Sequence, residues 1–366
     1  MKKTLIITLA SLSATALADT PEGWLSADNP SAYTLGAMEF ELNVGGVAVN
    51  DTLDVFDVRG DLLAGNRSLE GDSGDLSGSV IDLQFGVTSF LTAFYRRQDT
   101  DMTVDVGEVR SANLLSLDDE LSTETSSYGL KWNIYESGRG NGNWTATSLE
   151  LTRSEGSSDD FSGTFDRVTL SNSLEIIFNT PATFRLQDME DEAWKARLLH
   201  TFPLSRNITS SIWGSYSETE ATSGTGSTIT SASLAPAFEQ AFKVENKQYT
   251  VGASVNWQIT PRIPLQLSYE YIRIQDTDHT VQVNPSNVLL PGFLRADNLT
   301  SMDHDDNHTL TGRLSFWITP QVTVSVTGKV FSNQFLGVIP HYQNPLAGSF
   351  SDEPYGYAGL HLGIKL

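Results

Sequence analysis

The hydrophobic positions of this chain recur at every second residue, from about residue 78 to the last one. The stretch 248–259 shows the pattern clearly, because its apolar residues alternate without a break with polar residues and glycine. Successive side chains of a β-strand point to opposite faces, so such a stretch separates an apolar environment from a polar one. The pattern predicts an all-β protein whose strands each lie between two different surroundings.

The connections between the predicted strands are alternately very short and long. Short turns are predicted at Val87–Phe90, Asn179–Ala182, Pro203–Arg206, Ile259–Arg262 and Ile318–Gln321. Long polar stretches lie between them, at roughly 99–125, 154–166, 218–245, 276–304 and 332–354. Transmembrane β-barrels have short periplasmic turns on one rim and long extracellular loops on the other. The sequence therefore favours a single antiparallel transmembrane barrel over a soluble sandwich.

Aromatic residues collect near both ends of the predicted strands. Those near the short turns are Phe85, Phe90, Trp132, Tyr135, Phe178, Phe202, Trp257, Phe316 and Trp317. Those near the long loops are Tyr95, Tyr128, Trp194, Tyr216, Tyr249, Tyr269 and Tyr271. Aromatic residues also favour strands in general. Two such girdles nevertheless match the two membrane–water interfaces, where amphipathic rings are enriched.

The predicted barrel has about fourteen strands, with twelve to sixteen left open. Counted from the C-terminus, they lie near 354–366, 321–331, 305–318, 264–275, 246–259, 206–217, 191–202, 183–188, 166–178, 143–153, 126–135, 90–98, 78–87 and 53–61. Residues 36–45 would make a fifteenth, although bacterial barrels of one chain have an even count. The strand at 183–188 is the weakest. The expected organisation is an irregular segment at 19–52 with a candidate extra strand, followed by a barrel at 53–366.

The first eighteen residues have the three regions of a secretory signal peptide. Met1, Lys2 and Lys3 form a positive start, an apolar stretch follows, and Ala16–Ala18 provides a small-residue cleavage site. We therefore expect residues 1–18 to be removed and Asp19 to begin the mature chain. No later apolar run is long enough for a membrane-spanning helix. The chain has no cysteine, so disulfides do not contribute to its stability.

The C-terminus resembles the last strand of bacterial outer-membrane β-barrel proteins. Its apolar phase consists of Ala358, Leu360, Leu362, Ile364 and Leu366, and the chain ends there. The resemblance implies a place in the outer membrane of a Gram-negative bacterium, among outer-membrane lipid and lipopolysaccharide. It also implies that the barrel-assembly machinery reads this strand. That class usually ends in an aromatic residue, so Leu366 departs from the pattern. The chain resembles the porin-like members of that class. The resemblance identifies no subfamily and leaves the oligomeric state open.

The charge of the chain excludes one class of partner. The formal net charge is −22, and losing Lys2 and Lys3 with the signal peptide takes it to −24. Such a chain will not bind nucleic acid by charge attraction. No motif for nucleotide binding, zinc binding or serine-type catalysis occurs, and no cofactor is expected. An outer-membrane protease or lipid-modifying enzyme would need a Ser–His or Asp–His group assembled in space, so no enzyme is predicted.

The best local cluster of metal-ligand types lies in one long predicted loop. Its candidates are Asp303, His304, Asp305 and His308. Carboxylates and imidazoles can bind a divalent cation, which could bridge to lipopolysaccharide phosphates. The Gly and distal Glu of a calcium loop are missing, so a solvated acidic loop is the favoured interpretation.

The polar phase of the strands carries the informative charges. It holds Arg96, Lys131, Lys195, Arg197, Arg313, Lys329, Lys365, Asp82, Glu150, Glu175 and Glu270. A basic residue facing mid-membrane lipid would cost about 2–4 kcal/mol, so this phase is expected to face the lumen. The charges could line a water-filled pore, or could pair with each other in a packed or plugged interior.

Three functional hypotheses fit this architecture. The first is a passive porin-like channel for small hydrophilic solutes, with a weak preference for anions because basic lumen charges outnumber acidic ones. The second is a transporter of hydrophobic compounds with the N-terminal segment in the lumen, although that segment has no continuous apolar stretch. The third is a structural or surface-interaction barrel whose long loops do the work. The fold alone does not choose among them.

Overall fold

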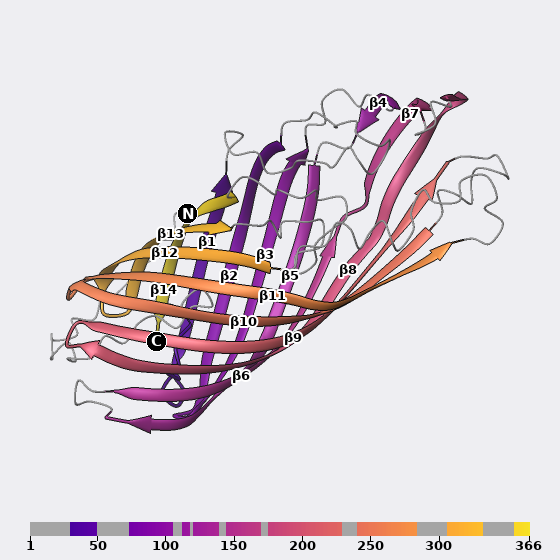
Figure 1. Ribbon diagram of the computed structural model, residues 1–366. Helices are drawn as coiled ribbons and strands as arrows, with labels where there is room; N and C mark the ends of the chain where they lie inside the picture. The colour runs from indigo at the N-terminus through magenta and orange to yellow at the C-terminus, as the bar shows by residue number, and fades with distance from the viewer. Residues whose placement is uncertain are drawn as a thin grey trace, which may run out of the picture.

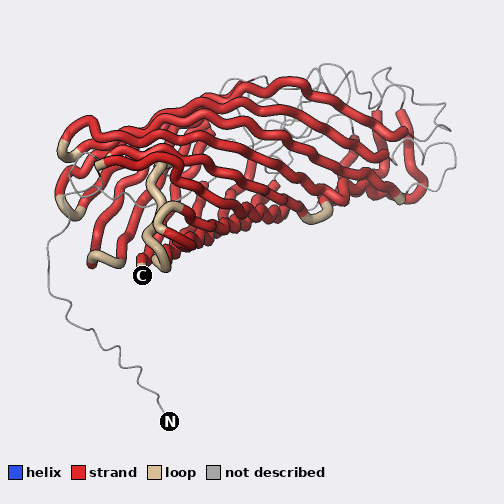
Figure 2. The backbone as a smooth tube through the Cα atoms, turned by 90° about the horizontal axis from the view of Figure 1, so that it is seen from below, coloured by secondary structure: helices blue, strands red, loops and turns tan. Residues whose placement is uncertain are grey.

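The computed structural model describes residues 30–49, 73–104, 112–117, 120–138, 144–169, 175–228, 240–283, 306–331 and 355–366. Strands account for nearly all of these residues, and within those ranges there is no helix (Figure 2). Accordingly, none of the described segments is a helix that could span a membrane. The strands are β1 (Phe40–Val49), β2 (Ser73–Thr88), β3 (Leu91–Val104), β4 (Ala112–Leu117), β5 (Glu120–Ser137), β6 (Thr145–Ser158), β7 (Phe161–Thr169), β8 (Glu175–Ser205), β9 (Ile208–Ser227), β10 (Gln240–Thr260), β11 (Ile263–Val283), β12 (Asp306–Thr319), β13 (Val322–Phe331) and β14 (Tyr355–Lys365).

Twelve of these strands form the wall of a closed antiparallel barrel (Figure 1). All strands except β4 and β7 belong to the wall, and β8 pairs with β9 to complete the ring. The first and last strands lie side by side, from Glu41 opposite Lys365 to Ala48 opposite Ala358. The predicted all-β antiparallel barrel is confirmed, and its count of twelve is even and lies within the expected range. Closure leaves no unpaired edge in the wall, as a membrane requires.

The barrel wall begins earlier than residue 53. The candidate extra strand at 36–45 corresponds to β1, which pairs with both β14 and β2. Its apolar residues Leu42 and Val44 alternate with inward-facing Glu41 and Asn43, as in the rest of the wall. The predicted strand at 53–61 and the signal peptide at 1–18 lie outside the described residues, and so they stay predictions.

One predicted turn is wrong. Asn179–Ala182 lies inside β8, a strand of 31 residues that replaces the predicted strands at 183–188 and 191–202 and part of 166–178. The outer part of β8 runs past the end of β6, where β7 pairs with it and β4 pairs with β7. The register of β7 and β8 shifts beside Pro181, and a bulge of this kind accommodates a proline. The stretch 154–166, predicted as a loop, is accordingly mostly strand.

The remaining short turns lie where they were predicted. They join β2 to β3, β8 to β9, β10 to β11 and β12 to β13, all at the end of the barrel that also holds the two ends of the wall. The long connections lie at the opposite end, although β9, β10 and β11 extend into the predicted loops. By the rule for this architecture, the short-turn end faces the periplasm.

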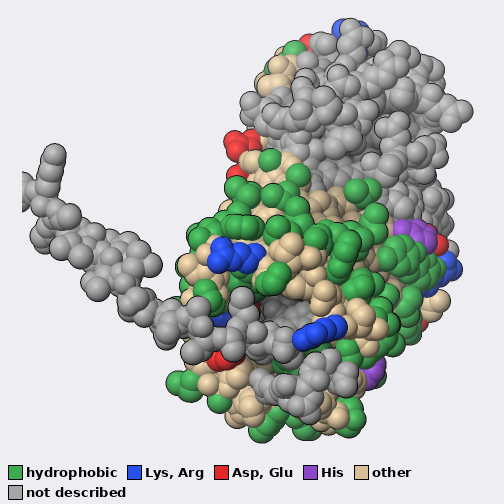
Figure 3. All heavy atoms as spheres, turned by 90° about the vertical axis from the view of Figure 1, so that its left-hand side faces the viewer, with side chains coloured by type: hydrophobic (Ala, Val, Ile, Leu, Met, Phe, Trp, Pro, Cys, Tyr) green, Lys and Arg blue, Asp and Glu red, His purple; other side chains and the backbone are tan. Residues whose placement is uncertain are grey.

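The wall is apolar outside and polar inside. Leu151 of β6 and Leu198 of β8 are 51% and 52% exposed, whereas Glu150, the residue before Leu151, is 5% exposed. Hydrophobic side chains cover much of the outer surface in Figure 3. On β10, an exposed apolar row runs from Tyr249 to Ile259, and ten rises along a strand tilted by about 40° span about 25 Å of membrane. This height matches the apolar band of an outer-membrane barrel.

Candidate functional site

The inward face of the barrel consists mainly of small polar side chains. Threonine, serine, asparagine and glutamine fill most inward positions of the wall, including Thr92, Ser148 and Thr323, which are fully buried. Alternation along the strands places these residues on the face opposite the exposed leucines and valines. The interior therefore offers hydrogen-bonding groups to whatever fills it.

The predicted lumen charges share this inward phase, with one exception. Asp82, Lys131, Glu150 and Arg313 are buried, and the partly buried members are Arg96, Lys195, Arg197, Glu270, Lys329 and Lys365. The backbone of Glu175 pairs with Thr169 of β7 in the extension beyond the wall. This position lies beyond the barrel wall, so it does not support the assignment of Glu175 to the lumen. The side chain itself is not among those that the structure describes.

Three of these charges form an ion-pair cluster on neighbouring strands. Glu150 of β6 accepts a hydrogen bond from Arg197 Nη2 of β8 and lies 3.9 Å from Lys131 Nζ of β5. The register explains the contact, because Glu150 lies directly opposite both Lys131 and Arg197. Opposite charges on adjacent strands of one face stabilise the sheet and each other.

A second group of charges continues the cluster across the lumen. Lys195 interacts electrostatically with Glu270 of β11 and with Lys329 of β13, as well as with Arg197. Glu270 also accepts a hydrogen bond of 3.0 Å from Trp213 Nε1. The Trp213 ring lies over Gly252, where a Cβ atom would collide with it. The six charged residues of these two groups share the described lumen with further inward charges, among them Glu41 and Asp82, which also act on Lys131, and Arg96 and Arg313.

Residues Pro30–Gly36, here called the lumen segment, lie inside the barrel at its short-turn end. Every side chain from Ser31 to Leu35 is at most 5% exposed. All the wall residues that bond the segment backbone are inward-facing, so the segment occupies the lumen.

Hydrogen bonds hold the backbone of the lumen segment to four strands of the wall. Ala32 N donates to Thr201 Oγ1 of β8 at 2.8 Å, and Leu35 N donates to Thr92 Oγ1 of β3 at 2.9 Å. The carbonyl oxygen of Ala32 accepts from Ser148 Oγ of β6 at 2.7 Å. The carbonyl oxygen of Ser31 accepts from Lys131 Nζ of β5 at 3.0 Å. The wall therefore satisfies the polar groups of a segment that has no regular secondary structure.

The side chains of the lumen segment form a small apolar cluster with the wall. Tyr33 stacks on Trp144, with ring centroids 3.8 Å apart, and its hydroxyl donates to the carbonyl oxygen of Trp144 at 2.8 Å. The cluster consists of Ala32, Tyr33, Leu35, Trp144, Ala146, Leu199 and Trp213. The cluster lies inside a mainly polar lumen, in which Val47, Val80, Val244 and Ile274 are further buried apolar residues.

A tight turn joins the lumen segment to β1. Met38 has a φ of 65°, and its N–H donates to the carbonyl oxygen of Gly86. The carbonyl of Gly36 lies so close to Gly86 that a Cβ atom there would collide with it. Gly86 is therefore needed for close packing of the turn against β2.

Sequence reasoning missed several inward residues and the whole lumen segment. Glu41, Asp191 and His361 face inward with the predicted charges. The alternation of β1 and β14 already contained the signal for Glu41 and His361. No periodic signal marks residues 30–36, because a segment without regular structure leaves none.

The metal candidates are not brought together within the described residues. Asp303, His304 and Asp305 lie outside those residues, and His308 is an exposed residue of β12. Its ring nitrogen Nδ1 bonds the hydroxyl of Tyr269 at 2.6 Å on the outer face. Among the residues that the structure describes, no group of three or more metal-ligand side chains is present.

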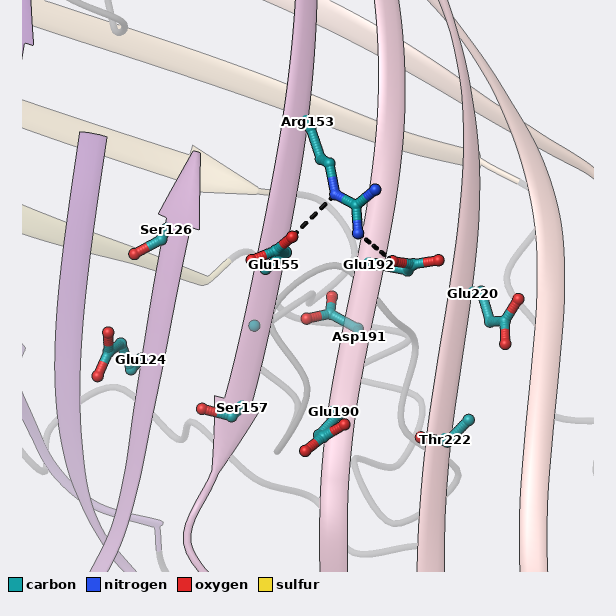
Figure 4. A pocket seen from close by; sticks show the side chains of 11 residues that line it. Glu124, Ser126, Arg153, Glu155, Ser157, Glu190, Asp191, Glu192, Glu220 and Thr222 are labelled. Carbon is teal, nitrogen blue, oxygen red and sulfur yellow. Dashed lines mark hydrogen bonds and ion pairs between the residues drawn. The ribbon is translucent and has the colours of Figure 1, made fainter. Parts of the chain in front are cut away.

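A polar cleft of about 550 Å³ lies on the outer face, beyond the apolar band on β5, β6, β8 and β9 (Figure 4). Arg153 donates to Glu155 Oε1 and to Glu192 Oε2, both at 2.8 Å, and lies 5.0 Å from the Trp194 ring. The outward-facing acidic residues that line the cleft are Glu124, Glu155, Glu190, Glu192 and Glu220, and the inward-phase residue Asp191 also contributes to its lining. The ion pair of Arg153 with Glu192 joins β6 to β8 above the membrane, and the pair with Glu155 lies within β6.

The terminal strand places its apolar residues outside. Leu360 and Leu366 are strongly exposed, Leu362 and Ala358 are exposed, and Ile364 is half-buried. The inward neighbours Gly359, His361 and Gly363 are buried. This placement agrees with a lipid-facing strand, and its recognition by the assembly machinery stays a prediction.

Comparison with known proteins finds similarity of fold only. No protein-family model matches the chain, and no curated protein matches it. The NanC porin is 7% identical, with a TM-score of 0.40 over 89% of this chain and 100% of that one. The toluene transporter TodX of Pseudomonas putida is 10% identical, with a TM-score of 0.43 over 91% and 90%. The outer-membrane protease OmpT of Escherichia coli is 7% identical, with a TM-score of 0.36 over 93% and 100%.

These three proteins have three different activities, and similarity this low transfers none of them. The placement of the chain rests on its own architecture. A closed barrel satisfies its own backbone hydrogen bonds, as a membrane requires, and its apolar exterior with aromatic girdles matches the lipid core and the two interfaces. The protein is an outer-membrane β-barrel protein of the kind found in Gram-negative bacteria.

Proposed function

We propose that this protein is a passive channel for small hydrophilic solutes, with a weak preference for anions. The observation that carries the proposal is the inward face, which presents hydroxyls, amides and charges along the wall strands. A pathway for apolar compounds would need clustered apolar side chains, and the apolar cluster in the described lumen is already filled by Tyr33 and Leu35.

The preference for anions follows from the charges near the middle of the lumen. The inward basic residues outnumber the inward acidic ones there: the former are Arg96, Lys131, Lys195, Arg197, Arg313 and Lys329, and the latter are Glu41, Asp82, Glu150 and Glu270. The screening length is about 8 Å at physiological salt, so these charges act more strongly on a passing ion than the acidic residues of the distant loops. A positive net charge in a narrow lumen raises the local concentration of anions.

The lumen segment narrows the periplasmic half of this pathway. It is hydrogen-bonded to β3, β5, β6 and β8, which are neighbouring strands of the wall. We expect a narrow channel that passes ions and small solutes rather than a wide pore.

Solute uptake into liposomes tests the proposal. Purified protein is reconstituted, and swelling rates are measured with arabinose, lactate and ethanolamine, which are small and carry charges of zero, −1 and +1. We expect all three to enter, with lactate ahead of ethanolamine. The variant Lys195→Gln/Lys329→Gln should reduce that difference, whereas Lys243→Gln, on the outer face, should not. Liposomes that stay impermeable to every solute would contradict the proposal and favour a structural or surface-interaction role.

A further inference from the structure

The part of the wall that contacts the lumen segment combines hydrogen-bond donors with an aromatic ring. Lys131 Nζ and Ser148 Oγ are donors aimed at two consecutive carbonyl oxygens of the segment. The Trp144 ring provides a flat face for Tyr33, and the Trp144 carbonyl accepts the tyrosine hydroxyl. Leu199 and Ala146 line the same place and are fully buried.

These wall groups need a partner whenever the segment leaves them. A buried donor without an acceptor costs about 1–3 kcal/mol, and more when it is charged. The segment satisfies the donors with carbonyl oxygens and covers the tryptophan with a phenol ring. A free molecule that carries two acceptor oxygens next to a phenyl or phenol ring presents the same groups.

We propose that the wall around Lys131, Ser148 and Trp144 is a binding site for an aromatic carboxylate, and that the lumen segment is its internal competitor. This inference rests on the proposed channel function, because it names the solute class that the lumen recognises. When the solute binds, the segment leaves the site; when the site is empty, Tyr33 fills it.

The charge of the site favours a carboxylate over a neutral oxygen compound. Lys131 forms an ion pair with Glu150, which it shares with Arg197, and the more distant carboxylates Glu41 and Asp82 also act on it. Lys195 adds a further positive charge to the same group of residues. A carboxylate would form an ion pair with Lys131 in place of its bond to the Ser31 carbonyl. It would also replace the neutral bond between Ser148 and the Ala32 carbonyl with a charge-assisted one, which is about twice as strong.

The geometry of Tyr33 favours an aromatic solute over an aliphatic one. Its ring lies nearly parallel to the Trp144 ring, with an interplanar angle of 19° and a centroid distance of 3.8 Å. Offset stacking of this kind contributes about 0.5–1.5 kcal/mol beyond burial of the ring. A hydroxyl at the far end of the ring would also take over the bond of Tyr33 to the Trp144 carbonyl.

Three related compounds separate these contributions. The probe is 3-(4-hydroxyphenyl)propionate, which has the ring, hydroxyl and carboxylate. Its amide lacks the charge, and 3-cyclohexylpropionate lacks the aromatic face. Binding is measured by isothermal titration calorimetry with the whole mature chain in detergent, so the result does not depend on transport.

Displacing the segment should strengthen binding of the probe. In one variant Ser31–Leu35 is replaced by glycine and serine at constant length, and in a second only Tyr33→Ala is made. We expect the dissociation constant to fall about tenfold in the first variant, because the apparent affinity rises with the fraction of molecules whose site is free. We expect a smaller fall for Tyr33→Ala, which also keeps the test valid if the longer replacement prevents folding.

Two substitutions in the wall should weaken binding in the background of Tyr33→Ala. Lys131→Met removes the donor while Arg197 still pairs with Glu150, and Trp144→Leu removes the stacking face. The matched control is Lys243→Met, a lysine of β10 on the outer face that pairs with Glu220 and Glu245. Circular dichroism and heat-modifiable migration in gels establish that each variant is folded.

The proposal predicts that the probe binds more tightly than its amide and than the cyclohexyl compound, and that Lys131→Met and Trp144→Leu remove this difference. It is overturned if displacing the segment leaves the dissociation constant unchanged, or if all three compounds bind alike. Solute uptake by liposomes with no selective binding of the probe would defeat this inference and leave the channel function standing. Selective binding of the probe without solute uptake would support the binding site and contradict the channel function.

Discussion

The outer and inner faces of β6 and β8 come from alternate residues of the same two strands, yet they follow opposite rules. Leu151 and Leu198 are exposed on the outside, while Glu150 and Arg197 form an ion pair inside. In a soluble protein the leucines would form the core and the charges would face water. The comparison shows that the alternation along one strand specifies two surroundings, lipid for one set of residues and the lumen for the other. The same substitution therefore has opposite consequences at adjacent residues.

The largest effect is expected from a charge placed on the outer face. Leu267 of β11 is exposed, and its neighbour Ser268 has the inward phase and is half-buried. Leu267→Arg should cost about 2–4 kcal/mol and reduce the yield of folded barrel in the outer membrane. Ser268→Arg should fold in good yield and increase the preference for anions. Equal losses of yield from the two variants would contradict the assignment of the faces.

A smaller effect is expected inside the lumen, where Glu150 forms ion pairs with Lys131 and Arg197. Glu150→Gln removes a charge-assisted hydrogen bond, with an expected loss of about 1.5–3 kcal/mol of folding free energy. It should also shift the reversal potential in a salt gradient toward anions, because two positive charges lose their counter-charge. Glu155→Gln, on the outer face above the membrane, is the control. A shift of equal size in both variants would argue against the central position of Glu150.

The stacking of Tyr33 on Trp144 should have a moderate effect on conduction. Loss of about 1 kcal/mol of stacking in Tyr33→Ala corresponds to a roughly fivefold change in the population of the displaced segment. Single-channel recording should therefore show a larger open conductance or longer openings. Thr34→Ala, which loses a bond to the carbonyl of Ser89 but no stacking, is the control. A native-like conductance of Tyr33→Ala would show that the segment does not restrict the pathway.

The smallest effect is expected from the ion pairs of the outer cleft. Arg153 contacts Glu155 and Glu192, whose side chains are nearly half exposed. Exposed pairs contribute about 0.2–1 kcal/mol, so Arg153→Gln should change the unfolding free energy by no more than about 1 kcal/mol. The change should shrink further in high salt, as measured by urea unfolding in lipid vesicles. A loss of several kcal/mol would mean that the cleft anchors β8 far more firmly than its exposure suggests.

The sequence predicted the wall of the barrel because alternation is a local signal that repeats. The inward phase of Lys131, Arg313 and Lys329 and the outward phase of Leu360 follow directly from that period. One predicted turn was wrong because its local sequence signal was misleading. The sequence Asn179–Ala182 has the composition of a turn, but β7 pairs with β8 on both sides of it, at Ile177 and at Ala182, so that it forms an irregularity within one strand. Pairing with a distant strand overrides local turn preference.

The lumen segment could not be found from the sequence for a different reason. Its position depends on contacts with Thr92, Lys131, Ser148 and Thr201, which are brought together only when the barrel closes. Those residues lie between 57 and 169 positions away from their partners. Nothing in residues 30–36 alone distinguishes a segment inside a barrel from one that lies outside it.

Ion conduction through planar bilayers tests the central claim most directly. The mature chain and the variant with Ser31–Leu35 replaced by glycine and serine are compared under a gradient of potassium chloride. The account predicts discrete steps for the native chain, larger steps for the variant, and reversal potentials that favour chloride in both. Bilayers that stay silent with both folded proteins would contradict it, because a polar lumen without the segment should conduct.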